Sequence, residues 1–115
     1  MTENSAMDFS RIQETSDGDR AFETELFEMY LEDTADRIQR LDTAIGSGDL
    51  ELCRREAHTI KGSSANVGAT RLQELALRLE GCDPVTRKPD AQALLTKIRD
   101  EFELVKSEIG AYLGA

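Results

Sequence analysis

The feature that most constrains the fold of this chain is the spacing of its apolar residues, which recur at steps of three and four in four segments. Such spacing gathers apolar side chains on one face of an α-helix. The segments are residues 20–45, 50–66, 70–80 and a last one that begins at residue 89 or 90. The residues expected to face inward are Phe22, Leu26, Met29 or Tyr30, Thr34, Ile38, Leu41, Ile45, Leu50, Cys53, Ala57, Ile60, Ser64, Val67, Leu72, Leu75, Ala76, Leu79, Leu94, Ile98, Phe102, Val105, Ile109 and Leu113.

Glycines separate these segments, at Gly46-Ser47-Gly48, Gly68 and Gly81. Gly68 suits the left-handed residue that commonly closes a helix, and Asp49 is a good N-cap for the helix that follows it. Because four amphipathic helices with short connections pack back and forth, the sequence predicts an all-α fold, an antiparallel up-down-up-down four-helix bundle. A chain of 115 residues has room for one such core, so residues 1–115 are expected to form a single domain.

Ahead of the first long helix, residues 8–14 carry Phe9 and Ile12 on one side and predict a short helix. A helix of this length is marginal by itself, so it is expected to lie as a lid over the bundle. Residues 1–7 are polar and terminal, and they are expected to be disordered.

The only histidine of the chain, His58, lies in the second long segment. It follows the inward-facing Ala57 by one residue, which is about 100° around the helix, so it is expected to face outward. The residues near it on that face are Arg54, Arg55, Lys61, Gly62 and Ala65. A glycine inside a helix costs about 1 kcal/mol relative to alanine. Two interpretations stay open at this point: an ordinary surface histidine beside a glycine that packs on another helix, or a histidine left open for access.

The run His58-Thr59-Ile60-Lys61-Gly62-Ser63-Ser64-Ala65-Asn66-Val67-Gly68 resembles the signature of histidine-containing phosphotransfer (HPt) domains. Gly48-Asp49-Leu50 before the run, and Leu72, Leu75 and Leu79-Glu80 after it, also fit the family's pattern. The resemblance covers about residues 22–80 in order, and the whole chain more loosely. It implies a four-helix module that carries a phosphoryl group between the receiver domains of two-component phosphorelays.

By this resemblance, His58 is expected to accept a phosphoryl group from a receiver-domain aspartate and to pass it to another receiver domain. Lys61 is expected to neutralise the phosphoryl charge, and Gly62 to leave space for the partner's active-site loop. Arg54, Arg55 and Ala65 are expected to belong to the docking face, although the two arginines could equally be simple solvated charges. The alternative function is that of a helical adaptor, which would occupy a receiver domain without being phosphorylated.

A second helix should bring Glu80 near the histidine. His58 precedes the end of its helix by about 12 Å of rise, and a similar rise from Thr70 reaches Glu80 on the next helix. Glu80 is therefore expected to lie level with His58, where its carboxylate could accept a hydrogen bond from one ring nitrogen and fix which nitrogen is free. The alternative is a solvated acid at the end of a helix.

The overall charge limits the partners. Fourteen basic and twenty-three acidic residues give a net charge of −9, which argues against nucleic acid and against an anionic membrane surface. No apolar run approaches the roughly 20 residues of a membrane span, and the N-terminus has no signal-peptide core, so a cytoplasmic protein is expected. The chain has two cysteines, Cys53 and Cys82; Cys53 belongs to the apolar face, which predicts a buried free thiol rather than a disulfide framework.

The chain carries no phosphate-binding loop, because Lys61-Gly62-Ser63 reverses the order that such a loop requires. Neither ATP binding nor autokinase activity is expected, and no cofactor or metal; by the resemblance, Mg²⁺ comes with the partner receiver domain. The expected partners are receiver domains and a hybrid sensor histidine kinase, and the chain is expected to be a monomer. A zinc site has too few ligands here, and a Ser-Lys hydrolase pair of Lys61 with Ser63 or Ser64 is disfavoured because neighbouring helical residues point apart.

Overall fold

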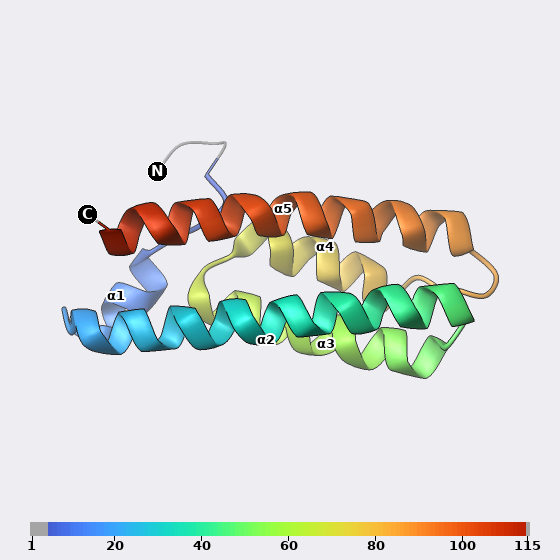
Figure 1. The fold of residues 1–115 in the computed structure, drawn as a ribbon, viewed down its shortest axis with the longest axis horizontal. Coiled ribbons are helices and arrows are strands. Elements are labelled where there is room, and N and C mark those ends of the chain that lie inside the picture. Colours follow the sequence, from blue (N-terminus) through green and yellow to red (C-terminus); the bar gives the residue numbers. More distant parts are fainter. Residues whose placement is uncertain (1–4, 115) are drawn as a thin grey trace.

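A computed structural model describes residues 5–114 of the chain, and every regular element in them is a helix (Figure 1). The elements are α1 (Ser10–Ser16), α2 (Arg20–Ser47), α3 (Leu50–Val67), α4 (Thr70–Glu80) and α5 (Lys88–Gly114). All five helices predicted from the sequence are present. The short helix lies two residues further along the chain than predicted, and α2 continues two residues beyond its predicted end at Ile45.

Side-chain caps and glycines explain where the helices begin and end, including the predicted caps Asp49 and Gly68. The Asp49 side chain accepts a hydrogen bond from the backbone N–H of Leu52 at 3.0 Å, and Asp19 does the same for Phe22 at 3.1 Å. Gly48 and Gly68 close α2 and α3 in the left-handed region, with φ of 72° and 87°. A side chain at such a φ is strained, so glycine ends both helices at low cost.

Helices α2 to α5 form the predicted antiparallel bundle. Each packs against two others, in the pairs α2–α3, α3–α4, α4–α5 and α5–α2. Helix α4 has 11 residues, whereas α2 has 28 and α5 has 27. The long helices therefore continue past α4, and α1 packs against α2 and α3 at the end where α2 begins and α5 finishes (Figure 1). The predicted lid helix is confirmed.

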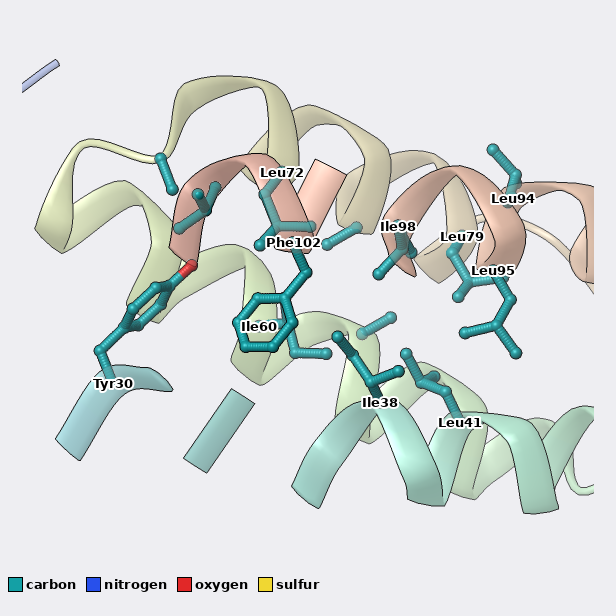
Figure 2. Close-up of a cluster of buried hydrophobic side chains, with 14 of the residues drawn as sticks. Tyr30, Ile38, Leu41, Ile60, Leu72, Leu79, Leu94, Leu95, Ile98 and Phe102 are labelled. Atoms are coloured by element: carbon teal, nitrogen blue, oxygen red, sulfur yellow. The ribbon is translucent and has the colours of Figure 1, made fainter. Parts of the chain in front are cut away.

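The core follows the predicted faces over most of the bundle. Ile38 and Leu41 of α2, Ile60 of α3 and the buried side chains of α4 and α5 converge between the helices (Figure 2). The labelled residues from α4 and α5 are Leu72, Leu79, Leu94, Leu95, Ile98 and Phe102. Leu26, Leu75 and Leu113 are only partly buried against this cluster.

The prediction is wrong at the first turns of α2. Phe22 is 40% exposed and Met29 is 61% exposed, whereas Phe27 is fully buried. Tyr30, the alternative to Met29, is the buried residue. The reason is that the buried face in this part of α2 runs through Glu23 and Phe27, one residue away from the face counted from Phe22.

Helix α1 explains how a glutamate can belong to the buried face. The Glu23 carboxylate accepts hydrogen bonds from Ser16 Oγ of α1 at 2.5 Å and from Tyr112 OH of α5 at 2.9 Å. The Tyr112 ring stacks on Phe9 with centroids 4.2 Å apart, and Phe9 meets the edge of Phe27. Hydrogen bonds of this kind lower the cost of burying a polar side chain.

The expected disorder of the N-terminus is wrong for Ser5 to Met7, while residues 1–4 lie outside the described part of the chain. Ala6 and Met7 are buried. The carboxylate of Glu108 accepts hydrogen bonds from the backbone N–H groups of Ala6 and Met7 at 2.6 and 3.1 Å, and from Ser5 Oγ at 2.8 Å. These contacts and the burial of Met7 offset the entropy cost that made disorder the expectation.

Both cysteines are free and buried, as predicted for Cys53. Burial raises the pKa of the Cys53 thiol to about 11, so at neutral pH this group is a protonated core residue. None of the helices in residues 5–114 is both long and apolar enough to span a bilayer.

Candidate functional site

His58 stands on the solvent face of α3, as the sequence predicts, with 66% of its side chain exposed. The opposite face of the same helix carries Cys53, Ala57, Ile60 and Ser64, all of them fully buried. Burial of that face fixes the rotation of α3 about its axis. The imidazole is therefore presented to solvent by a helix that cannot turn without exposing core residues.

Glu80, the last residue of α4, joins His58 to Lys61. One carboxylate oxygen, Oε2, lies 2.8 Å from His58 Nδ1, and Oε1 accepts a hydrogen bond from Lys61 Nζ at 2.7 Å. The expectation that Glu80 lies level with His58 is confirmed, and the alternative of a freely solvated acid is wrong. The ion pair between Lys61 and Glu80 could not be foreseen, because nothing in the sequence sets the distance between the two helices.

This contact determines the role of each ring nitrogen. The hydrogen bond from Lys61, and to a smaller extent that from His58, lowers the pKa of the Glu80 carboxyl below its ordinary value. Glu80 is therefore ionised at neutral pH, and an ionised carboxylate can only accept hydrogen bonds. His58 Nδ1 must then be the donor, which leaves the lone pair of the neutral ring on Nε2.

The other ring nitrogen is open. Among residues 5–114, no hydrogen-bond partner of the His58 imidazole other than Glu80 is found. With the side chain mostly exposed, the Nε2 lone pair faces solvent. The site thus presents an accessible ring nitrogen, while the contact between Nδ1 and Glu80 fixes the orientation of the imidazole.

Gly62 decides between the two interpretations left open by the sequence. A Cβ atom built on Gly62 would meet no atom within 4 Å outside its own helix backbone, and the residue is exposed. Packing against a neighbouring helix is therefore wrong as an explanation of this glycine. Ala65, one turn further along, is half-buried, so small residues continue the open surface beside the imidazole.

Arg54 and Arg55 lie exposed on α3, one turn before His58. Neither forms an ion pair within the part of the chain that the structure describes. The contrast is with Arg37 and Arg40 of α2, whose guanidinium groups bind the buried carboxylate of Glu56 at 3.1 and 2.9 Å. The exposed pair of arginines is therefore available to an acidic partner.

The two serines of the motif have structural contacts. Ser64 Oγ lies 2.8 Å from Tyr30 OH in the core, and burial raises the pKa of Tyr30 to about 12, which keeps its hydroxyl neutral. Ser63 Oγ donates to the carbonyl of Ile60 at 3.3 Å, while Lys61 Nζ is bound to Glu80. No Ser-Lys hydrolase pair forms, and residues 5–114 contain no cluster of three or more His, Cys, Asp or Glu side chains suited to a metal ion.

Comparison with known proteins agrees with this geometry. Residues 25–108 match the family described as the Hpt domain. The chain is 32% identical over 109 residues to histidine-containing phosphotransfer protein 2 of Arabidopsis thaliana, covering 83% of this chain and 70% of that protein. The fold matches the crystal structure of histidine-containing phosphotransfer protein B (HptB) from Pseudomonas aeruginosa PAO1, with a TM-score of 0.86, 23% identity and 97% of each chain covered.

The family match includes α3 and α4, the two helices that supply His58, Lys61, Gly62 and Glu80. The lone exposed histidine, the open glycine beside it and the bundle that holds them all fit one interpretation. This chain belongs to the histidine-containing phosphotransfer (Hpt) domain family.

Proposed function

We propose that this protein is a phosphoryl carrier of a two-component phosphorelay, which accepts a phosphoryl group on His58 from a receiver-domain aspartate and passes it to a second receiver domain. The observation that carries the proposal is the exposed Nε2 of His58, held by Glu80 through Nδ1. A nucleophile in a reversible carrier has to be neutral, accessible and correctly oriented. The contact between Glu80 and His58 orients the imidazole. The buried face of α3 fixes the opposite face, which carries His58, toward solvent, so the ring is accessible.

The transfer step forms one bond and breaks another. The Nε2 lone pair attacks the phosphorus of the aspartyl phosphate, the P–O bond breaks, and its electron pair stays on the receiver's carboxylate. Phosphoryl transfer of this kind depends on positioning and on neutralising the phosphoryl oxygens. The same chemistry in reverse passes the phosphoryl group from His58 to the aspartate of a second receiver domain. We expect Mg²⁺ to be bound by the receiver domain, and no ATP binding, autokinase activity or cofactor on this chain.

Lys61 is placed to neutralise the phosphoryl group. Its ammonium has three N–H donors, and one of them is used by Glu80. The remaining two can bind phosphoryl oxygens while the pair with Glu80 keeps the side chain beside His58. Lys61 can thus assist transfer without leaving its resting position.

Replacing Lys61 with alanine is expected to slow phosphoryl transfer by about 100-fold, the lower end of the effect of removing one preorganised donor to a developing negative charge. The fold should persist, because Lys61 lies on the surface of α3 and the lost ion pair with Glu80 is partly exposed. Rapid-quench measurement of transfer from a phosphorylated receiver checks this. An unchanged transfer rate would remove the role assigned to Lys61.

Two substitutions at Gly62 are expected to have opposite effects, one raising stability and the other blocking transfer. Gly62→Ala is expected to raise the free energy of unfolding by about 1 kcal/mol, because the added Cβ meets open space and alanine favours the helix. Gly62→Leu is expected to block transfer from a receiver domain, since its side chain occupies the docking surface. Denaturant titration measures the first effect and transfer kinetics the second.

A small phosphoryl donor separates access from chemistry in the Gly62→Leu variant. Phosphoramidate needs no docking surface, so it should still phosphorylate His58 in this variant. Loss of labelling by both donors would place the damage at the imidazole instead of the interface. Transfer from the receiver at the wild-type rate would show that Gly62 does not serve docking.

Arg54 and Arg55 supply the charge of the proposed docking surface. The chain is acidic overall, so two arginines one turn from His58, with no ion pair among residues 5–114, form a local positive area. The acidic pocket of a receiver domain would be attracted to it. Receiver domains and a hybrid sensor histidine kinase are the partners that this surface fits, and we propose that the protein meets them as a monomer.

The direct test is incubation of the protein with a phosphorylated receiver domain, followed by addition of a second, unphosphorylated receiver. Acid-labile phosphate should appear on the wild-type protein and then move to the second receiver. Tight binding with no phosphate on the protein would overturn the proposal in favour of the adaptor. An equal mixture that contains ATP without any receiver serves as the control and should leave the protein unlabelled.

A further inference from the structure

Resting on the proposed phosphorylation of His58, we infer that Glu80 keeps the phosphorylated ring in its donating form by holding a proton on Nδ1. Glu80 is then a positioning residue with a second task, which begins after the phosphoryl group has arrived. The consequence is a carrier that releases its phosphoryl group readily and does not store it.

The geometry places a full negative charge against one ring nitrogen. Glu80 Oε2 lies 2.8 Å from Nδ1, and the Glu80 side chain is only 26% exposed, so water screens this contact incompletely. The other oxygen binds Lys61 at 2.7 Å, which keeps the carboxylate ionised and in place. A charged acceptor makes a stronger hydrogen bond to a cationic donor than to a neutral one.

The charged groups around the ring are few. Helix α3 contributes Lys61, with Arg54 and Arg55 one turn away, and α4 contributes Glu80. Within residues 5–114, no ion pair joins a charged side chain of α2 or α5 to His58 or to Glu80. The charge that acts directly on Nδ1 is therefore that of Glu80.

The chemistry of the phosphorylated ring makes this proton decisive. Attack by Nε2 leaves the proton on Nδ1, so the first product is a phosphorylated imidazolium that carries a positive charge on the ring. When the P–N bond breaks from this form, its electron pair returns to Nε2 and the ring leaves as neutral imidazole. If Nδ1 has lost its proton, the same cleavage has to expel an imidazolate anion, which is a much poorer leaving group.

Glu80 favours the first of these two forms. The negative charge of Glu80 stabilises the cationic ring. It has no comparable effect on the phosphorylated ring that has lost its Nδ1 proton and is neutral. The proton on Nδ1 is consequently retained to higher pH than it would be without the carboxylate. Lys61 offsets the repulsion between Glu80 and the phosphoryl oxygens, so the two negative groups can share the site.

The test compares Glu80→Gln with Glu74→Gln. A glutamine at position 80 keeps a carbonyl oxygen that can accept a hydrogen bond from Nδ1–H, but it carries no charge. Glu74 is an exposed residue of the same helix for which no ion pair is found among the described residues, so Glu74→Gln removes an equal charge away from the ring. Each protein is phosphorylated with phosphoramidate and freed of the reagent, and loss of the phosphohistidine signal is followed by ³¹P NMR from pH 5 to pH 9.

In water, hydrolysis reports the same bond cleavage, because a water oxygen forms the new P–O bond and the ring leaves. The hydrolysis rate should fall to half of its low-pH value at a pH about one unit lower in Glu80→Gln than in the wild type. A shift of about one unit is the lower end of the pKa change that a nearby opposite charge produces. Above that pH, the phosphorylated variant should last about tenfold longer than the wild type, because the protonated fraction of the ring falls about tenfold for each pH unit. Glu74→Gln should follow the wild-type curve.

Superimposed curves for Glu80→Gln and the wild type, or a displacement of the variant's curve to higher pH, would overturn the inference. An equal displacement in Glu74→Gln would also overturn it, because the effect would then belong to the net charge of the protein. Failure of the proposed function looks different: no phosphohistidine signal would appear on the wild-type protein from a phosphorylated receiver domain. Phosphoramidate labelling still allows the comparison at Glu80 in that case.

Discussion

His58→Gln is expected to abolish acid-labile phosphorylation of the protein while changing the free energy of unfolding by less than about 1 kcal/mol. The loss is complete because His58 is the only histidine of the chain, so no second imidazole can accept the group. Stability is nearly unchanged because the side chain is 66% exposed, and its one polar contact is with the partly exposed Glu80. The measurements are phosphate incorporation from a labelled receiver domain and thermal unfolding by circular dichroism.

The variant also separates binding from chemistry. The proposed docking residues Arg54, Arg55 and Gly62 are untouched, so His58→Gln should still bind the receiver domain with an affinity close to that of the wild type. Two results would contradict the prediction. Acid-labile phosphate on His58→Gln would place the acceptor on another residue, and a large fall in the melting temperature would make His58 a structural residue.

Gly68→Ala is expected to lower the free energy of unfolding by about 2 to 4 kcal/mol, among the large effects of a single substitution. Two costs add. Gly68 has a φ of 87°, where an alanine is strained, and a Cβ at this position would clash with the backbone oxygen of Asp8. The N-terminal segment would have to move, and the hydrogen bond of 2.7 Å from the Asp8 N–H to the Gly68 carbonyl would be disturbed.

Gly18→Ala provides the matched control. Gly18 has a similar φ of 84°, but a Cβ there would meet nothing within 4 Å. Its replacement should therefore cost only the backbone strain, about 1 kcal/mol. Urea denaturation of both variants measures the difference, which reports how firmly the Asp8 backbone is held against Gly68 at the end of α3. Equal losses in the two variants would show that this segment moves aside freely.

The sequence by itself determined the helices and most of their buried faces. Apolar steps of three and four locate α2 to α5, and Gly48 and Gly68 mark where two of them end. These features are local, because helix formation and helix closure depend on neighbours within about one turn. The exposure of His58 is local in the same sense, since it follows from its position beside Ala57 on one helix.

The sequence misplaced two features that depend on residues far apart in the chain. Phe22 was expected inside and is partly exposed, because Ser16 and Tyr112 satisfy the Glu23 carboxylate and allow the neighbouring face of α2 to be buried. Ser5 to Met7 were expected to be disordered, yet Glu108, about one hundred residues away, binds their backbone. A local pattern carries no information about such partners.

At the site, the sequence located the exposed histidine and the open surface beside it, whereas the tertiary structure decided how the imidazole is held. The lone histidine and Gly62 could be identified within a single helix. That Glu80 would contact His58 and Lys61 at once depends on the distance between α3 and α4 and on the rotamers of three side chains. Spacing along a chain fixes the level of a residue on its own helix, but only packing of the core between the two helices brings the carboxylate within 2.8 Å of the ring.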